Sequence, residues 1–369
     1  MTGASPPSVA HALWSGGAGG IERLVHDLAQ RQREQGMTVS VAFAQLRGPF
    51  AEGMRDAGLQ VVDLGLGSGY DLRPPRIRGG AHELGAFDVI HLHAFNLPLG
   101  AIAIASRRPI VFTEHGNFGA GRKVGIAGQL RRPAQRAFIS RACTEIAANS
   151  RWTAARMADL YGIEADRVTV IHNGIGGSPA EGSVARERDD RMVVAFVGRL
   201  AGFKRVDRLL KALSQVREGQ PIRALIVGEG PLEGELKDLT SRLGCDSFVE
   251  FLGYRSDVEA ILSATDVLVQ PSEGEPFGLA ILEACRQGAL PVVFADGGGA
   301  LEVLPPDGRI VADESDLASV LVELADDAAV RSETARQARA QWAVERFPID
   351  RTAAAYLTLY RSALERRQA

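Results

Sequence analysis

The most informative segment of the chain spans residues 271–284 and reads PSEGEPFGLAILEA. The apolar run before it, Val267 to Gln270, predicts a strand, and a helix is expected to follow the loop. Glu275 would then lie where the loop meets the helix, with Glu283 about a turn and a half farther on. Free backbone amides near residues 277–279 would point toward a ligand at this helix start.

Strand-like and helical patterns alternate along the rest of the chain. Apolar residues recur at i, i+3, i+4 and i+7 between short apolar runs, as in Val206, Leu209, Leu210 and Leu213. This alternation predicts an α/β fold, with parallel sheets covered by helices on both faces. The predicted strands are residues 9–13, 39–43, 89–92, 110–113, 168–171, 193–197, 223–227, 249–252, 267–270 and 291–294.

The length of 369 residues suits two domains better than one core. Residues 174–191 carry glycines, a proline and mixed charges without apolar periodicity, so the domain break is expected there. We expect a first Rossmann-like domain over residues 1–173, a second over residues 174–345, and a helix over residues 346–369 that packs back on the first. Two doubly wound domains of this kind would face each other across a ligand-binding cleft.

Composition excludes several classes of protein. Hydrophobic residues make up 46% of the chain, yet no apolar run approaches the ~20 residues of a membrane span. The first ten residues lack the pattern of a secretory signal, so a cytoplasmic location is expected. The three cysteines are widely spaced and fit neither a disulfide framework nor a zinc site. Aromatic residues are few and do not alternate with cations, so nucleic acid is not an expected partner.

Glycine-rich loops follow predicted strands at residues 16–20 and 297–299. Glycine lets the backbone approach a ligand closely, and the helix that follows offers free amides for a phosphate. A nicotinamide dinucleotide site is not favoured, because Glu22 stands where the third glycine of that fingerprint belongs. The next strand is followed by Gln45 rather than by an acid that could bind a ribose.

Arg199 and Lys204 lie five residues apart on the loop after the strand predicted at 193–197. An arginine fork and a compact lysine charge at this spacing can converge on one polyanion. The alternative is a charged loop in solvent, which is the more common fate of such residues.

These segments, in order along nearly the whole chain, resemble glycosyltransferase family 4, whose members are retaining enzymes of the GT-B fold. The spacing of Glu275 and Glu283 is the most specific part of the resemblance. In the second half, the matching segments are GRL and a lysine within 198–204, VGEGPL at 227–232, FLG at 251–253, residues 275–283, and the glycine loop with Glu302. In the first half they are the glycines of 16–20, DVIHLH at 88–93, TEHG at 113–116 and VIHNGI at 170–175.

The resemblance implies a role for each matching residue. Arg199 and Lys204 would bind a diphosphate and stabilise its charge as it leaves. Glu283 would hold ribose hydroxyls, Glu275 would hydrogen-bond sugar hydroxyls, and His115 would meet the sugar from the opposite domain. The backbone at Tyr254 and Arg255 would contact the base. The full set of donor-binding residues then adds Gly19, Gly20, Gly198, Glu229, Phe277, Gly278, Leu279, Gly298 and Gly299.

The reaction expected from the resemblance is transfer of a hexosyl group, with retention, from a UDP- or GDP-sugar to a hydroxyl acceptor. Cations and amides would stabilise the leaving diphosphate, so neither a metal nor another cofactor is expected. The alternatives are a nucleotide-sugar epimerase of the same fold and a non-catalytic nucleotide-sugar binding protein. The sequence departs from the family at Arg205, where glycine is usual, and at Gly176, where aspartate is common.

His91 and His93 lie two residues apart on a predicted strand and could face the same side, like a pair of metal ligands. No third ligand is evident nearby, so they are interpreted as core or cleft histidines.

The acceptor side of the chain is basic. Residues 116–144 contain six arginines and lysines and no acidic residue. They also contain a short apolar repeat at Leu130, Ala134 and Phe138. This segment, residues 122–141 above all, could touch an anionic lipid surface or a lipid-linked saccharide at the inner face of a membrane. A solvated helix face explains the same pattern and is slightly favoured.

Overall fold

The computed structural model describes residues 5–17, 19–116, 126–177, 191–216 and 220–368, without the side chains of 126–132 and 368. The chain divides into two compact units. Unit 1 comprises Met1–Gly174 and Ile349–Ala369, and unit 2 comprises Ile175–Pro348. The division falls at Pro348, three residues later than the boundary expected from the sequence.

Unit 1 is built on one parallel sheet. Its strands are β1 Val9–Ser15, β2 Val39–Gln45, β3 Gln60–Asp63, β4 Val89–Leu92, β5 Ile110–Glu114, β6 Glu145–Ala148 and β7 Val168–Val170. Its helices are α1 Gly20–Glu34, α2 Pro49–Asp56, α3 Pro74–Gly85, α4 Leu97–Ala105, α5 Ile126–Ala142, α6 Arg151–Tyr161 and α13 Ile349–Gln368. The strand order is β3-β2-β1-β4-β5-β6-β7, with Val9 of β1 opposite Val39 on one side and Val89 on the other.

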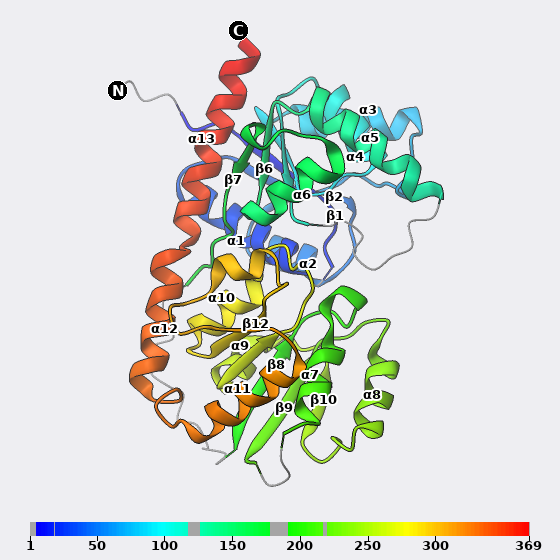
Figure 1. The fold of residues 1–369 in the computed structure, drawn as a ribbon. Coiled ribbons are helices and arrows are strands. Elements are labelled where there is room, and N and C mark those ends of the chain that lie inside the picture. The colour runs from blue at the N-terminus through cyan, green and yellow to red at the C-terminus, as the bar shows by residue number, and fades with distance from the viewer. Residues whose placement is uncertain (1–4, 18, 117–125, 178–190, 217–219, 369) are drawn as a thin grey trace. The chain divides into compact units, whose positions relative to one another are not determined.

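The terminal helix α13 belongs to unit 1 and contacts α1 and the strands β4, β5 and β6 (Figure 1). Its Tyr356 and Tyr360 are fully buried against these strands. The helix therefore supplies part of the core of a unit whose other residues end at Gly174, 175 positions before the helix begins at Ile349.

Unit 2 is a second parallel sheet. Its strands are β8 Met192–Val197, β9 Ile222–Val227, β10 Val249–Gly253, β11 Val267–Gln270, β12 Leu290–Phe294 and β13 Arg309–Val311. Its helices are α7 Val206–Leu213, α8 Glu233–Arg242, α9 Val258–Ser263, α10 Leu279–Arg286, α11 Glu314–Asp326 and α12 Glu333–Arg346. The strand order is β10-β9-β8-β11-β12-β13.

Strand order reverses once in each sheet, between β1 and β4 in unit 1 and between β8 and β11 in unit 2. The chain leaves neighbouring strands in opposite directions at such a point, which opens a crevice beyond their carboxyl ends. The loops after β8 and β11 carry Lys204 and Glu275, so the topology brings these two segments to the same place in unit 2.

All ten strands predicted from the sequence are present, and no end differs from its predicted position by more than two residues. The strands β3, β6 and β13 were not predicted. They are only three or four residues long, and β6 reads EIAA, which has the composition of a helix as much as of a strand.

Candidate active site

Three loops of unit 2 are tied together by backbone hydrogen bonds at the carboxyl end of the sheet. The amide of Glu273 donates to the carbonyl of Phe203 at 3.0 Å, which joins the loop after β11 to the loop after β8. The amide of Glu275 donates to Gly297 at 3.1 Å, and the amide of Gly299 donates back to Glu275 at 2.7 Å. The loops predicted to bind the donor thus form one framework, with Glu275 at its centre.

The side chains of Lys204 and Glu275 form an ion pair across this framework. The Nζ–Oε2 distance is 2.7 Å, and only 14% and 10% of the two side chains are exposed. The Gln270 amide nitrogen donates to the same Oε2 at 2.9 Å and to Ser272 Oγ at 2.9 Å. Gln270 and Ser272 were not singled out from the sequence. Their position at the end of a predicted buried strand is the signal that could have found them.

Burial raises the pKa of the Glu275 carboxyl, but the positive charge of Lys204 and hydrogen bonds from Lys204, Ser272 and Gln270 outweigh it. The net pKa therefore lies below the ordinary value of 4.5. Glu275 is a carboxylate at neutral pH, and it holds the Lys204 ammonium in a fixed position.

Arg199 differs from Lys204 in its surroundings. It is exposed and, within the ranges that the structure describes, its side chain has no hydrogen-bond or ion-pair partner. The charge of Lys204 is offset by Glu275, so Arg199 is the uncompensated cation of this loop.

Close backbone contact explains the glycines around this loop. Gly228 has φ +125°, and a Cβ there would collide with the carbonyl oxygen of Gly198. A Cβ on Gly230 would collide with the carbonyl of Leu200, whose amide donates to Glu229 at 3.0 Å. The segment 228–230 therefore supports the loop that carries Arg199, while the Glu229 side chain itself is exposed.

The helix α10 begins beside the same framework. Gly278 precedes it with φ +98°, a conformation that a side chain would strain. Phe277 is buried and packs edge-to-face on Phe347 at 6.1 Å, which fixes the start of the helix. Glu283 is half-buried on α10. The amides of Phe277 to Leu279 thus lie at the N-terminal start of α10. The first amides of a helix lack acceptors within the helix.

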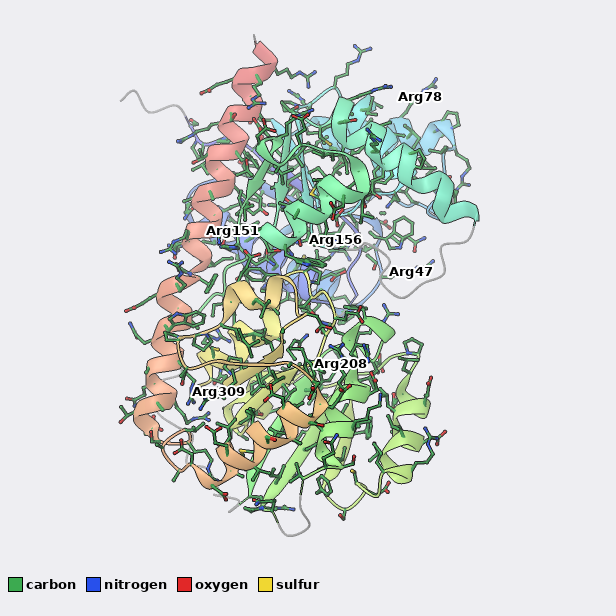
Figure 2. All side chains as sticks on the ribbon, in the orientation of Figure 1. Arg47, Arg78, Arg151, Arg156, Arg208 and Arg309 are labelled. Carbon is green, nitrogen blue, oxygen red and sulfur yellow. The ribbon has the colours of Figure 1, made fainter. Side chains whose placement is uncertain are left out.

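The backbone and the ion pairs of Arg205 show how an arginine is accommodated where glycine is usual in the family. Its φ is +49°, in the left-handed region where glycine is favoured. The guanidinium bonds Asp207 at 3.0 Å and Glu273 at 3.2 Å, which offsets some of the strain of this conformation. Arg208 of α7, labelled in Figure 2, donates two 2.8 Å hydrogen bonds to the Asp296 carboxylate. These bonds link α7 to the loop after β12.

The residues expected to read the base stand apart from the Lys204–Glu275 pair. Tyr254 is half exposed. Arg255 is exposed and pairs with Asp257 at 2.6 Å. Within the described residues, neither side chain forms a hydrogen bond or ion pair with Lys204 or Glu275, and the backbone contact with a base at these positions stays a prediction.

In unit 1, the glycine loop after β1 is also shaped by close backbone contact. The amide of Gly16 donates to Arg47 at 2.8 Å, and a Cβ on Gly48 would collide with the Gly16 carbonyl. Gly19 precedes α1 in an extended conformation and Gly20 is its first residue. The amides at the start of α1 therefore border this loop, as the sequence predicts.

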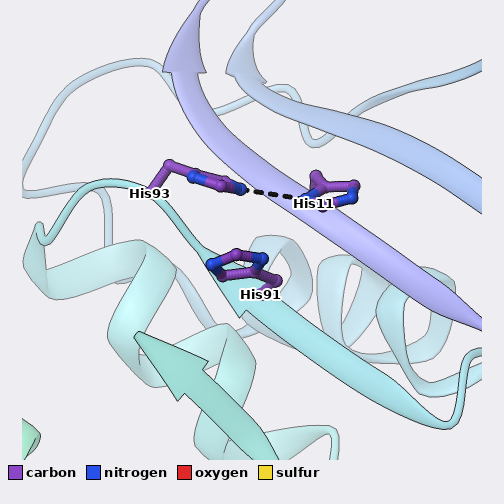
Figure 3. A group of neighbouring side chains, drawn as sticks. All are labelled: His11, His91 and His93. Atoms are coloured by element: carbon purple, nitrogen blue, oxygen red, sulfur yellow. Dashed lines mark hydrogen bonds between the residues drawn. The ribbon is translucent and has the colours of Figure 1, made fainter. Parts of the chain in front are cut away.

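His115 lies at the end of β5 in unit 1 and belongs to a cluster of buried imidazoles. Figure 3 shows three of them, His11 from β1, His91 from β4 and His93 just after it. His91 and His93 do lie on the same side, with ring centroids 3.9 Å apart. The third imidazole, His11, was not predicted, because it lies eighty residues earlier in the chain.

The three rings have ligand atoms within 4.8 Å of one another, as a metal site would require. However, each of their six nitrogens already has a hydrogen-bond partner. The cluster satisfies itself through hydrogen bonds, so the interpretation as core histidines is preferred to a metal site.

Comparisons with known proteins agree with this architecture. Residues 18–176 match the family model described as Glycosyltransferase Family 4, and residues 180–341 match the one described as Glycosyl transferases group 1. The chain belongs to the family 4 glycosyltransferases of the GT-B fold.

Proteins with similar sequences have names that point to different activities. A D-inositol 3-phosphate glycosyltransferase of Streptomyces scabiei is 29% identical over 96% of this chain and 89% of that protein. A glycogen synthase of Mycobacterium tuberculosis is 31% identical over 68% of this chain. An uncharacterized glycosyltransferase of Methanocaldococcus jannaschii is 31% identical over 40% of this chain. The matches to the last two span 63% and 41% of those proteins, so their names do not fix a substrate for this chain.

Solved structures share the fold over nearly the full length. HepE of Anabaena, in complex with UDP and glucose, has a TM-score of 0.78 and 25% identity over 95% of this chain and 99% of that chain. WaaG, a glycosyltransferase involved in lipopolysaccharide biosynthesis, has a TM-score of 0.72 and 20% identity over the same shares. Within the described residues, no helix has the length and apolar character needed to cross a membrane.

The ion pair predicts a specific pH dependence of stability. Because the folded pKa of Glu275 is lowered, its carboxylate stabilises the fold above the ordinary value of 4.5, and this contribution disappears as the pH falls through the folded value. We expect Glu275→Gln to lower the melting temperature most near neutral pH, and the difference from wild type to shrink as the pH falls below the ordinary value of 4.5 and through the folded pKa.

Glu250→Gln is the matched control, because Glu250 pairs with Arg223 in a half-exposed ion pair of the same unit. Such pairs contribute about 1 kcal/mol or less, so its melting temperature should stay near that of wild type. A Glu275→Gln deficit that is equal at every pH would contradict the account.

Proposed function

We propose that the chain is a retaining glycosyltransferase that moves a hexosyl group from a UDP- or GDP-sugar to a hydroxyl acceptor. The observation that carries this proposal is that one loop of unit 2 carries two cations. Lys204 is largely buried and held by Glu275, and Arg199 is exposed and uncompensated. This loop lies at the topological switch point, where such folds bind nucleotides. HepE, which shares this fold at 25% identity, binds UDP and glucose, which supports a nucleotide-sugar donor here.

In the proposed reaction, the bond between carbon one of the sugar and the phosphate oxygen breaks, and a bond from carbon one to the acceptor oxygen forms. Negative charge develops on the departing diphosphate, where Arg199, Lys204 and the first amides of α10 would stabilise it. The acceptor proton passes to the leaving phosphate oxygen on the same face of the sugar. These cations supply the positive charge that the leaving group needs, so we propose that neither a metal nor another cofactor is required.

Glu275 acts in this proposal first through Lys204. It fixes the ammonium before the donor arrives, so no reorganisation is needed as charge develops. We propose that its carboxylate also accepts a hydrogen bond from a sugar hydroxyl, that Glu283 binds the ribose, and that the amides of Gly298 and Gly299 border the phosphates.

Arg199→Ala is the sharpest test, because Arg199 is exposed and its loss leaves no buried charge behind. With a donor identified by a thermal-shift screen of nucleotide sugars, we expect transfer to fall by about 10²-fold or more at an unchanged melting temperature. Arg242→Ala, an exposed arginine at the end of α8, is the control and should keep wild-type activity. Full activity in Arg199→Ala would contradict the diphosphate role. Donor consumption that does not depend on an acceptor would favour an epimerase, and binding without turnover would favour a non-catalytic binding protein.

We also propose a cytoplasmic enzyme whose unit 1 contacts an anionic membrane surface on the acceptor side. The side chains of residues 122–132 lie outside those that the structure describes. The described part of this region forms a groove of about 780 Å³ between α4 and α5, with apolar lining and with Arg107, Arg108 and Arg141 around it. Leu72 and Ile104 at this groove are 50% and 55% exposed. Apolar side chains among arginines suit a lipid or lipid-linked saccharide with an anionic head group.

Ile104→Asp places a negative charge at this groove and should reduce co-sedimentation with phosphatidylglycerol vesicles by several-fold. Ile310→Asp is the control, because Ile310 is equally exposed, at 57%, but lies on β13 of unit 2. Wild-type protein that does not sediment with these vesicles, or equal loss in both variants, would contradict the membrane contact.

A further inference from the structure

Eight buried side chains of unit 1 form one continuous line of hydrogen bonds that the proposed mechanism does not use. They come from β1, α1, β4, β5 and α13 and from the residues just after β4 and β5. His115 is 7% exposed and the others 2% or less. The line runs His115–His93 3.0 Å, His93–His11 2.9 Å, His11–Gln32 2.8 Å, Gln32–Tyr360 3.3 Å, Tyr360–His91 2.8 Å, His91–Thr113 2.7 Å and Thr113–Tyr356 3.2 Å.

Every imidazole in this line is neutral at physiological pH. Burial lowers the pKa of His11 and of His115 to about 4, and it lowers the pKa values of His91 and His93 well below the ordinary value of 6.5. A neutral imidazole carries one N–H donor and one acceptor nitrogen. If one nitrogen of a ring accepts a hydrogen bond, the other must therefore donate one, so the donor-to-acceptor direction is the same on both sides of the ring.

Gln32 sets that direction, because its carbonyl oxygen can only accept. His11 Nε2 must donate to Gln32 Oε1, so His11 Nδ1 accepts from His93 Nε2. His93 Nδ1 then accepts from His115 Nε2. Gln32 is therefore three hydrogen bonds away from His115 and still determines which nitrogen of His115 carries the proton.

The other end of the line fits the same direction. The Gln32 amide nitrogen donates to Tyr360 Oη, whose hydroxyl proton is then available to His91 Nδ1. His91 Nε2 donates to Thr113 Oγ1, which donates to the hydroxyl of Tyr356. Hydroxyl groups can donate in either direction, so they follow the orientation of Gln32 and do not impose one.

We propose that Gln32 is a positioning residue that locks His115 in the tautomer with the proton on Nε2. The lock leaves His115 Nδ1 as a hydrogen-bond acceptor, and within the described residues this atom has no partner. Its use in orienting a hydroxyl of the donor sugar rests on the proposed function. A purely structural role for the network would require its bonds to be made but would not require one direction.

The direction can be measured on the free enzyme. With ¹⁵N-histidine labelling, long-range ¹H–¹⁵N correlation spectra report which nitrogen of each ring carries the proton. We expect Nε2–H at His11, His93 and His115 in the wild type. Nδ1–H at His115 in the wild type would overturn the proposal without any variant.

Gln32→Met removes the acceptor while keeping most of the volume. A buried N–H without an acceptor is rarer in proteins than a buried acceptor without a donor, so the line should reverse and move the proton of His115 to Nδ1. Tyr356→Phe is the matched control. It deletes a buried hydroxyl of the same line beyond Gln32, so the tautomers of His11, His93 and His115 should not change. His115 that stays Nε2–H in Gln32→Met would overturn the proposal.

Kinetics then separate this proposal from the proposed function. We expect kcat/KM for transfer to fall about tenfold in Gln32→Met, the effect of one hydrogen bond, and to stay near wild type in Tyr356→Phe. A reversed tautomer with unchanged kcat/KM would overturn the role of Nδ1 in orienting the sugar. A wild-type enzyme that transfers no sugar would contradict the proposed function, while the spectra would still decide whether Gln32 sets the tautomer.

Discussion

The site of unit 2 depends on one buried ion pair. Only 14% of the Lys204 side chain and 10% of the Glu275 side chain are exposed, so the loss of either partner leaves a largely desolvated charge without its counter-ion, which is costly. The partners come from loops that follow β8 and β11, the two strands between which the sheet order reverses. Backbone hydrogen bonds hold these loops and the glycine loop after β12 together, so the charges are placed before any ligand binds.

The strand order reverses in the same way in the two units, but the side chains at the switch point are charged in unit 2 and neutral in unit 1. Unit 2 places charged side chains at its switch point, one of them balanced and one, Arg199, left uncompensated. Unit 1 places neutral imidazoles at the corresponding strands, and burial keeps them neutral. A charged surface of this kind suits a diphosphate, whereas a neutral, directional hydrogen-bond network suits a sugar hydroxyl.

Much of this could be predicted from the sequence, because it depends on local pattern. Alternating apolar runs located ten strands, and the glycine loop after β12 and the segment around Glu275 were correctly expected between a strand and a helix. Pairings between distant residues could not be predicted from pattern: Glu275 lies 71 residues from Lys204, and Tyr360 lies 328 residues from Gln32. The short strand β6 was missed because EIAA carries no strand signal, and its place in the sheet comes from its neighbours β5 and β7. The left-handed backbone at Arg205 also became visible only in the structure, and it explains why glycine is the usual residue there.

We propose that the ammonium of Lys204 binds the diphosphate and does not only join two loops. Calorimetric titration of a nucleoside diphosphate and of the matching nucleoside, into wild type and into a folded Lys204→Met variant, tests it most directly. If the ammonium binds the diphosphate, the substitution should weaken binding of the diphosphate by about tenfold or more, as loss of a charged hydrogen bond does, and leave the nucleoside affinity unchanged. Equal losses for both ligands, or no loss for either, would contradict it.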